Sequence, residues 1–192
     1  MISEKGKFVF IHPPKTAGSS ICFALKDYGT GLSFSEDTGN AIFDGSITIR
    51  KHANVQLIKE RLGSDWSEYK KFSVVRNPWD RYVSVYFWLK HLNHEQVEGL
   101  DFRDFILGRS RLNSCYEYCQ INDELVVDKV LRYENLEEEF GALCDEWSLV
   151  ATPLTQCNQI NRPHYSHFYN KETRDMVAER MKTDIEFFNY SF

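Results

Sequence analysis

The sequence lacks any apolar run long enough to cross a membrane. No stretch of about 18 consecutive apolar residues occurs, which is the length that a spanning helix needs. The first residues, Met1 to Lys7, have neither the apolar core nor the small-residue cleavage site of a secretory signal peptide. We therefore expect a protein without a membrane span, and the missing export signal predicts a cytoplasmic location.

Cysteine is sparse and irregularly spaced. The five cysteines are an odd number, and their spacing matches none of the patterns that bind structural zinc. Cys115 and Cys119 are four residues apart, so they share one face of a helix, where packing is a simpler explanation than metal binding. We expect free thiols in a reducing compartment and no metal site.

Repeats, low-complexity tracts and signs of a second domain are also missing, so we expect a single domain over residues 1–192. With 42% hydrophobic and 15% aromatic residues, the chain can fold around a core. A net charge of −5 argues against a general binder of nucleic acid or membrane surfaces. Residues 50–90, however, hold nine Lys and Arg against four Asp and Glu. This local excess fits a discrete anion pocket, although most such charges lie on solvated helix faces.

Strand and helix patterns alternate along the chain. Short apolar or alternating runs predict strands at 7–12, 46–50, 71–75 and within 125–133. Apolar residues at helical spacing follow each of them, and this alternation predicts an α/β fold with a parallel sheet flanked by helices. The helices are expected after Ser19 as N-cap, over 55–62, after Pro78, after Asn135 with Glu138 in a capping box, and from about Lys171.

The segment from Pro13 to Ser20 joins the first strand to a helix. Its two prolines exclude a strand or a helix interior. Backbone N–H groups at the start of a helix attract phosphate, Gly18 allows close approach to the backbone, and Lys15 supplies a mobile cation. An ordinary strand-to-helix turn explains the same spacing equally well, and the nucleotide-triphosphatase pattern G-x-x-x-x-G-K-[ST] is absent. Further hydroxyl donors in this segment are Thr16, Ser19 and Ser20.

A second strand-to-helix junction has the sequence RNPWDRYVS, residues 76–84. Arg76 directly follows its strand, at the carboxyl end, where open α/β sheets bind ligands. A guanidinium group can bind phosphate through two N–H groups at once, and Ser84, two turns into the helix, can add a hydroxyl. The simpler alternative is a local ion pair between Arg76 and Asp80.

Together the two junctions resemble the phosphate-binding motifs of the sulfotransferases that use 3′-phosphoadenosine 5′-phosphosulfate (PAPS). The sequence IHPPKTAGSS, residues 11–20, resembles their 5′-phosphosulfate loop, and FSVVRNPWDRYVS, residues 72–84, resembles their 3′-phosphate motif. The resemblance is greatest to the carbohydrate branch, which includes the heparan sulfate 2-O and 6-O enzymes and small bacterial relatives. Weaker resemblances to that branch occur at 51–53, 131–136, 161–165 and 184–192.

The resemblance implies a P-loop-like nucleotide-binding fold and in-line transfer of a sulfuryl group from PAPS to a hydroxyl, with a carbohydrate as the expected acceptor. It implies that Lys15 stabilises the leaving group, the bisphosphate product PAP, and that no metal is needed. His52 matches the strand-end histidine of the branch and is implied to be the general base. The residues implied to bind the cofactor are Lys15, Thr16, Ala17, Gly18, Ser19, Ser20, Arg76, Ser84 and Arg162.

Alternatives remain at this stage. From the residues alone, His52 also fits a histidine that caps the next helix, and then His164 or Glu134 would be the next candidates for the base. A small-molecule kinase on a related scaffold would bind ATP with magnesium, whereas a sulfotransferase would bind PAP without it. A catalytically inactive adaptor would bind PAP without turnover.

Overall fold

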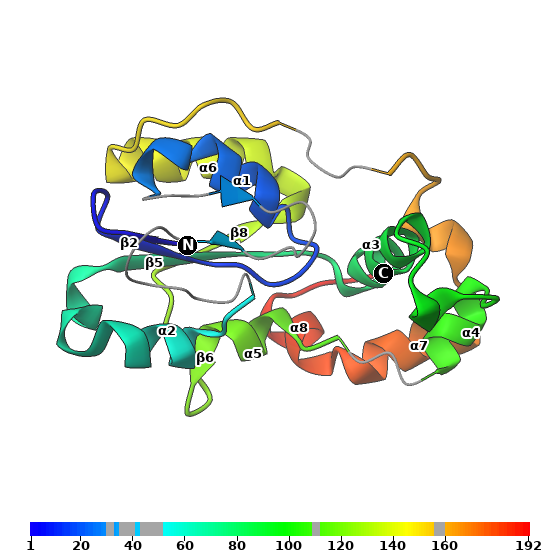
Figure 1. The fold of residues 1–192 in the computed structure, drawn as a ribbon. Coiled ribbons are helices and arrows are strands. Elements are labelled where there is room, and N and C mark those ends of the chain that lie inside the picture. The colour runs from blue at the N-terminus through cyan, green and yellow to red at the C-terminus, as the bar shows by residue number, and fades with distance from the viewer. Residues whose placement is uncertain (30–32, 35–40, 43–51, 109–111, 156–159) are drawn as a thin grey trace. The chain divides into compact units, whose positions relative to one another are not determined.

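The computed structural model describes the chain except residues 30–32, 35–40, 43–51, 109–111 and 156–159 (Figure 1). The expected strand at 46–50 therefore lies outside the described residues. The chain packs as two compact units, each built from two segments. The first, here called the sheet unit, comprises 1–75 and 117–157, and the second, the helical unit, comprises 76–116 and 158–192. The single domain over 1–192 stays a prediction.

A four-stranded sheet organises the sheet unit. Strands β2 (Phe8–Ile11), β5 (Lys70–Val75) and β8 (Lys129–Arg132) run parallel, as predicted. Strand β1 (Ile2–Ser3) pairs antiparallel with β2 at the edge, so the sheet is mixed, in the order β1-β2-β5-β8. Because the register pairs Ile11 with Ser73, the carboxyl ends of β2 and β5 lie at the same edge of the sheet.

Alternate residues of β2 face opposite sides of the sheet, as the pleat of a strand requires. Phe8 and Phe10 belong to the core cluster under helices α1 (Gly18–Ala24) and α6 (Leu136–Trp147). Val9 and Ile11 belong instead to the cluster that packs against helix α2 (Val55–Leu62). Figure 1 shows the same layers, with α1 and α6 on one face of the sheet and α2 on the other.

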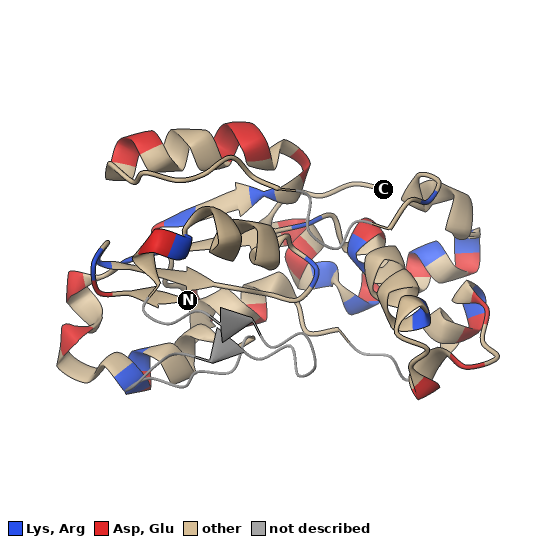
Figure 2. Cartoon of the chain, turned by 45° about the horizontal axis from the view of Figure 1, so that its top comes forward, with Lys and Arg blue, Asp and Glu red and all other residues tan. Residues whose placement is uncertain are grey.

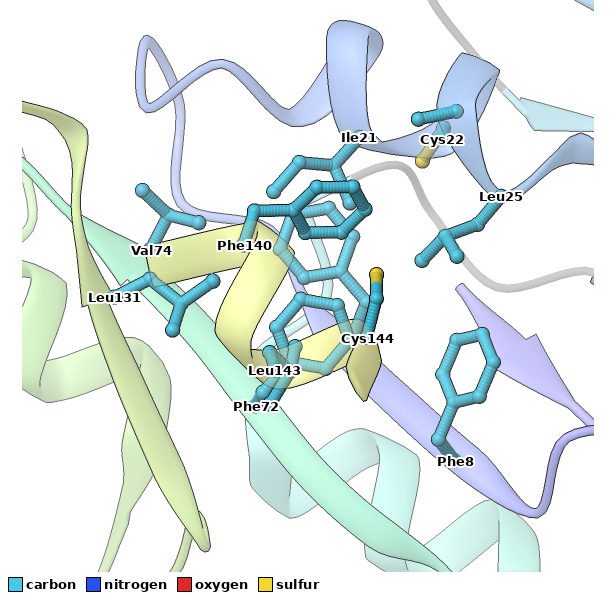
Figure 3. Packing of buried hydrophobic residues seen from close by; sticks show 12 residues of the cluster. Phe8, Ile21, Cys22, Leu25, Phe72, Val74, Leu131, Phe140, Leu143 and Cys144 are labelled. Atoms are coloured by element: carbon cyan, nitrogen blue, oxygen red, sulfur yellow. The ribbon is translucent and has the colours of Figure 1, made fainter. Parts of the chain in front are cut away.

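Aromatic and aliphatic side chains fill the first of these clusters (Figure 3). Phe10 stacks on Phe72 with ring centroids 4.8 Å apart, and Trp147 meets Phe72 edge-on at 5.7 Å. Full burial of each large apolar side chain contributes about 1.5–3 kcal/mol, so this cluster anchors α1 and α6 to the sheet. Acidic residues occupy the first turn of α6 (Figure 2), where the helix dipole favours them.

Two of the predicted helix starts are wrong in detail. Helix α1 begins at Gly18 with Ala17 as its N-cap, so Ser19 lies inside the first turn and is not the cap. Asn135 does stand at the N-cap of α6, but among the described residues its side chain makes no capping hydrogen bond, so the capping box with Glu138 is absent. A short 3₁₀ turn, Tyr133–Asn135, already leads the chain into α6, which removes the need for a side-chain cap.

Helix α3 (Pro78–His91) forms the centre of the helical unit. Tyr82 and Tyr86 of α3 are buried, and they pack among residues of the other helices of this unit. Arg81, also on α3, forms a buried ion pair with Asp184 at 3.9 Å. Burial raises the pKa of Asp184, although Arg81 and two backbone N–H groups act in the opposite direction. The other helices here are α4 (Phe102–Leu107), α7 (Lys171–Arg180) and α8 (Lys182–Phe187).

Short elements connect these parts. Besides Tyr133–Asn135, 3₁₀ turns are formed by Lys26–Tyr28, Gly63–Glu68, Glu95–Val97 and Tyr165–Phe168. Two small antiparallel pairs are formed by β3 (Ser33–Phe34) with β4 (Ala41–Ile42) and by β6 (Gln120–Ile121) with β7 (Glu124–Leu125). Helix α5 (Cys115–Cys119) carries the chain from one unit to the other.

The cysteines within the described ranges, Cys22, Cys115, Cys119 and Cys144, are all buried and lie outside any disulfide, as predicted for these four. Over the same described ranges, none of the helices has both the length and the apolar character that crossing a bilayer requires.

Candidate active site

The loop between β2 and α1 has a strained, fixed shape. Lys15 and Ala17 both adopt left-handed backbone conformations, with φ of 65° and 63°. Such conformations cost non-glycine residues roughly 1–3 kcal/mol each and persist only where the surroundings impose them. Part of this restraint comes from Thr16, which is fully buried and donates its hydroxyl hydrogen to the Pro13 carbonyl at 2.8 Å. The buried hydrogen bond of Thr16 therefore restrains the shape of the loop.

Gly18 lies directly against the imidazole ring of His12. A Cβ atom on Gly18 would stand 1.7 Å from Nε2 of His12, so no other residue fits here without displacing the ring. His12 is itself only 6% exposed, and it stacks on Phe10 with ring centroids 5.6 Å apart. The buried ring of His12 thus supports the end of the loop where α1 begins.

His52 is oriented by the same residue. Its Nδ1 lies 2.8 Å from the backbone carbonyl oxygen of His12, and its ring meets the His12 ring edge-on at 4.7 Å. Because a carbonyl oxygen can only accept, Nδ1 carries the hydrogen and donates it. In the neutral ring this tautomer makes Nε2 the proton acceptor. The side chain of His52 is exposed, as a base that must reach a substrate would be.

The remaining predicted residues of the loop continue into α1. Ala17 is the N-cap of the helix, and Ser19 and Ser20 lie in its first turn. Ser20 is buried at 6% exposure, whereas Lys15, Ala17 and Ser19 are half-buried. The sheet unit therefore brings together the whole loop and His52.

Arg76 and Ser84 come together in the helical unit, as their spacing predicted. Nη1 of Arg76 lies 3.3 Å from the hydroxyl oxygen of Ser84. The other edge of the same guanidinium group, Nε and Nη2, donates to Oδ2 of Asp80 at 3.0 and 2.7 Å. The local ion pair and the arginine–serine pair are thus both present, on different edges of one guanidinium group, and Arg76 as a residue is only 7% exposed.

Arg162 joins this group through the same carboxylate. Its Nη2 donates to Oδ1 of Asp80, so one acid bridges two guanidinium groups. Burial would raise the pKa of Asp80, but the charges and hydrogen bonds of Arg76 and Arg162 outweigh it and hold the pKa below its ordinary value of 3.8. Asp80 is therefore ionised at neutral pH, and the three side chains carry a net charge of +1.

Asn77 fixes the start of α3 beside these groups, a role that the sequence analysis did not assign. Its Oδ1 accepts hydrogen bonds from the backbone N–H groups of Trp79 and Asp80 at 3.1 and 3.4 Å. Its Nδ2 donates to the carbonyl of Ser191 at 2.9 Å, and the ring of Phe192 meets that of Trp79 edge-on at 5.5 Å. Asn followed by Pro at the first helical position is a recognisable start signal, whereas the contact with Ser191 has no local signature.

The two alternative candidates for the base lie in or next to 3₁₀ turns. His164 caps the 3₁₀ turn Tyr165–Phe168, with Nδ1 2.9 Å from the hydroxyl oxygen of Ser166. Glu134 is exposed within the turn that precedes α6. Within the sheet unit, His52 contacts His12, and the ring of His12 lies against Gly18 of the Lys15 loop.

A model of the sulfotransferase family matches residues 1–191, which include both the Lys15 loop and the Arg76 group. A search of curated proteins finds none with significant similarity to this sequence.

Proposed function

The chain belongs to the sulfotransferase family, and from this premise we propose that it transfers a sulfuryl group from PAPS to a hydroxyl group of a carbohydrate. The acceptor oxygen attacks sulfur while the bond from sulfur to the 5′-phosphate oxygen breaks, and PAP leaves. The hydroxyl proton passes to a base on the protein. Transfer of this kind depends mainly on positioning and on stabilising charge in the transition state. The carbohydrate acceptor is proposed from the resemblance to the carbohydrate branch.

The observation that carries the proposal is that His12 contacts both parts of the catalytic machinery. Its carbonyl oxygen accepts the hydrogen bond from His52, and its ring lies against Gly18 of the loop. The base and the loop that would hold the phosphosulfate thus share one buried support. A histidine that merely capped a helix would need no such link, and helix α2 is in fact capped by the side chain of Asn54.

His52 acts as the general base in this proposal. With Nδ1 committed to the carbonyl of His12, Nε2 accepts the proton of the acceptor hydroxyl as the oxygen attacks. A positioned base of this kind contributes about 10²–10⁴-fold to the rate.

Lys15 neutralises the negative charge that grows on the bridging oxygen as the leaving group departs. Its left-handed backbone, fixed together with that of Ala17, presents the side chain from a rigid loop. The backbone of Thr16, Ala17 and Gly18 and the hydroxyls of Ser19 and Ser20 bind the 5′-phosphosulfate.

Arg76 and Ser84 bind the 3′-phosphate. The hydroxyl of Ser84 and Nη1 of Arg76, 3.3 Å apart, are two donors that one phosphate oxygen or two neighbouring oxygens can accept together. The assignment agrees with the net charge of +1 on the group that includes Asp80 and Arg162. Because Lys15 and the arginines supply the positive charge, the proposed mechanism requires no metal.

The test is transfer of radiolabelled sulfate from PAPS to a panel of glycans, lipids and small alcohols. We expect labelled glycan without added magnesium, and loss of labelling in His52→Ala. The matched control is His91→Ala, a histidine in the last turn of α3. Binding of PAP without any transfer would instead support an inactive adaptor, and binding of ATP only with magnesium would support a kinase.

A further inference from the structure

We propose that Asp80 is a positioning residue that holds Arg162 beside Arg76, so that two guanidinium groups bind the 3′-phosphate. This inference depends on the proposed function, which makes Arg76 a ligand of that phosphate. It assigns to Asp80 a part in nucleotide selectivity, although a carboxylate cannot itself attract a phosphate.

Asp80 and Ser84 contact different edges of the Arg76 guanidinium group. Asp80 takes the Nε and Nη2 edge through a single oxygen, Oδ2, at 3.0 and 2.7 Å. The end of the guanidinium group that carries Nη1 lies beside Ser84. Asp80 and an incoming phosphate therefore use different N–H groups of Arg76, so the acid orients the arginine without competing for the same donors.

The second carboxylate oxygen of Asp80, Oδ1, binds the second arginine, Arg162. Oδ1 accepts from Nη2 of Arg162, a residue outside any helix or strand and 82 positions away in the sequence. Irregular segments do not fix a long side chain by themselves, because ordering it costs conformational entropy. The carboxylate of Asp80 supplies the compensating interaction.

Charge and burial make this bridge necessary. The side chains of Arg76, Asp80 and Arg162 are only 8%, 17% and 14% exposed, so solvent screens them weakly. Two guanidinium groups this close repel each other unless an anion lies between them. Asp80 is that anion before the nucleotide binds, and it keeps the pair assembled.

A simpler role for Asp80 also exists. It stands in the first turn of α3, where an acidic residue interacts favourably with the helix dipole. That role predicts a loss of stability on substitution, but no change in the preference for a nucleotide with a 3′-phosphate. The ratio of affinities for PAP and AMP, which differ only in that phosphate, therefore separates the two roles.

The experiment is calorimetry of PAP and of AMP with the full chain, for wild type, Asp80→Asn, Arg162→Ala and the double variant. We expect Asp80→Asn to lower the preference for PAP over AMP by about tenfold. A change of this size corresponds to the free energy that a hydrogen bond to a charged group typically contributes. We expect Arg162→Ala to lower it by about fivefold in the wild-type background, but by less than about twofold when Asp80 is already replaced. Glu186→Gln is the matched control, because Glu186 forms an exposed i,i+4 ion pair with Lys182 in the same unit.

The outcomes separate this inference from the proposed function. A wild type that binds PAP and AMP equally contradicts the proposed function itself. A wild type that prefers PAP, with the preference kept or raised in Asp80→Asn, overturns the role of Asp80. Independent, multiplying effects of the two substitutions overturn it as well. If Asp80→Asn does not fold, the effect of Arg162→Ala in the wild-type background decides, since an unchanged preference there contradicts the two-arginine site.

Discussion

The backbone of Gly18 packs directly against the imidazole ring of His12, so closely that a Cβ on Gly18 would stand 1.7 Å from Nε2 of that ring. Gly18→Ala must therefore displace either the loop or the histidine, and overpacking of this kind costs about 1–3 kcal/mol. We expect a lower free energy of unfolding in urea denaturation together with a large loss of sulfate transfer. The reason is that the ring of His12 supports the loop, while the backbone carbonyl of His12 orients His52.

Gly141 provides the control for that substitution. It lies inside α6, and, apart from its chain neighbours and the backbone of its own helix, no heavy atom of the described residues lies within 4 Å of the position that its Cβ would take. Alanine is preferred over glycine in a helix interior by about 1 kcal/mol, so Gly141→Ala should stabilise the protein and leave transfer unchanged. Equal losses in both variants would mean that the contact between Gly18 and His12 has no special part.

His52→Ala should lower turnover by about 10²–10⁴-fold while PAP affinity stays nearly unchanged, because the base acts on the acceptor and not on the nucleotide. Turnover of the wild type should fall on acidification, since a protonated imidazole cannot accept a proton, and this acid limb should disappear from the pH–rate profile of the variant. Retention of more than about a tenth of the activity, well short of the general-base effect, would move the search to His164 and Glu134.

Lys15→Ala should lower kcat far more than it weakens PAP binding. Negative charge on the bridging oxygen grows in the transition state, so the contribution of the lysine is larger there than in the ground state. Single-turnover kinetics and PAP titration measure the two effects separately. Lys26→Ala, which removes an exposed lysine from the turn after α1, is the control. A variant that lost only affinity would show that Lys15 serves as a ground-state anchor.

Arg76→Ala should abolish the preference for PAP over AMP, which we expect to be at least tenfold in the wild type, or about 1.4 kcal/mol. Affinity for AMP should change little, because AMP has no 3′-phosphate for Arg76 to bind. Calorimetry measures both ligands. The control is Arg103→Ala, since Arg103 pairs with Glu172 in an exposed ion pair of the same unit. A preference that survived in Arg76→Ala would assign the 3′-phosphate to other residues.

The lowered pKa of Asp80 predicts a pH dependence of stability. The unfolded chain takes up a proton at this carboxyl near its ordinary value of 3.8, whereas the folded chain does so only at lower pH. The stabilisation by Asp80 is therefore complete above that value and is lost as the pH falls below it. Asp80→Asn should be less stable than the wild type at pH 6 by about 1–3 kcal/mol, and the difference should shrink by pH 3. A difference that is constant with pH would contradict the ionised bridge.

The layered part of the fold could be predicted from local patterns. The strands β2 and β5 and the helices α2 and α3 agree with the sequence analysis, because apolar periodicity reports directly on which face is buried. The side-chain caps expected at Ser19 and Asn135 could not be predicted correctly. At α1 a left-handed Ala17 takes the N-cap position, and at α6 a 3₁₀ turn precedes the helix, so the expected side-chain hydrogen bonds do not form. Local residue preferences do not report such backbone alternatives.

For the candidate site, prediction from the sequence was limited by the large separation in sequence between residues that are in contact. The pairing of Arg76 with Ser84 follows from helical spacing, because both lie within two turns of the same strand-to-helix junction. The bridge from Asp80 to Arg162 and the contact of Asn77 with Ser191 span 82 and 114 positions. No spacing rule connects residues so far apart. The link between His52 and the carbonyl of His12 was hidden for another reason, because a backbone acceptor has no residue type to recognise.

The buried thiols also allow local opening of this protein to be measured through their chemical modification. Cys22 and Cys144 lie in the core of the sheet unit, whereas Cys115 lies in the helical unit. A thiol reagent can modify each of them only during the brief intervals in which its surroundings open. Modification rates resolved by mass spectrometry would therefore measure the opening of the two units separately, and no cysteine needs to be introduced into the chain. Comparing those rates with and without PAP would show which unit the nucleotide holds closed.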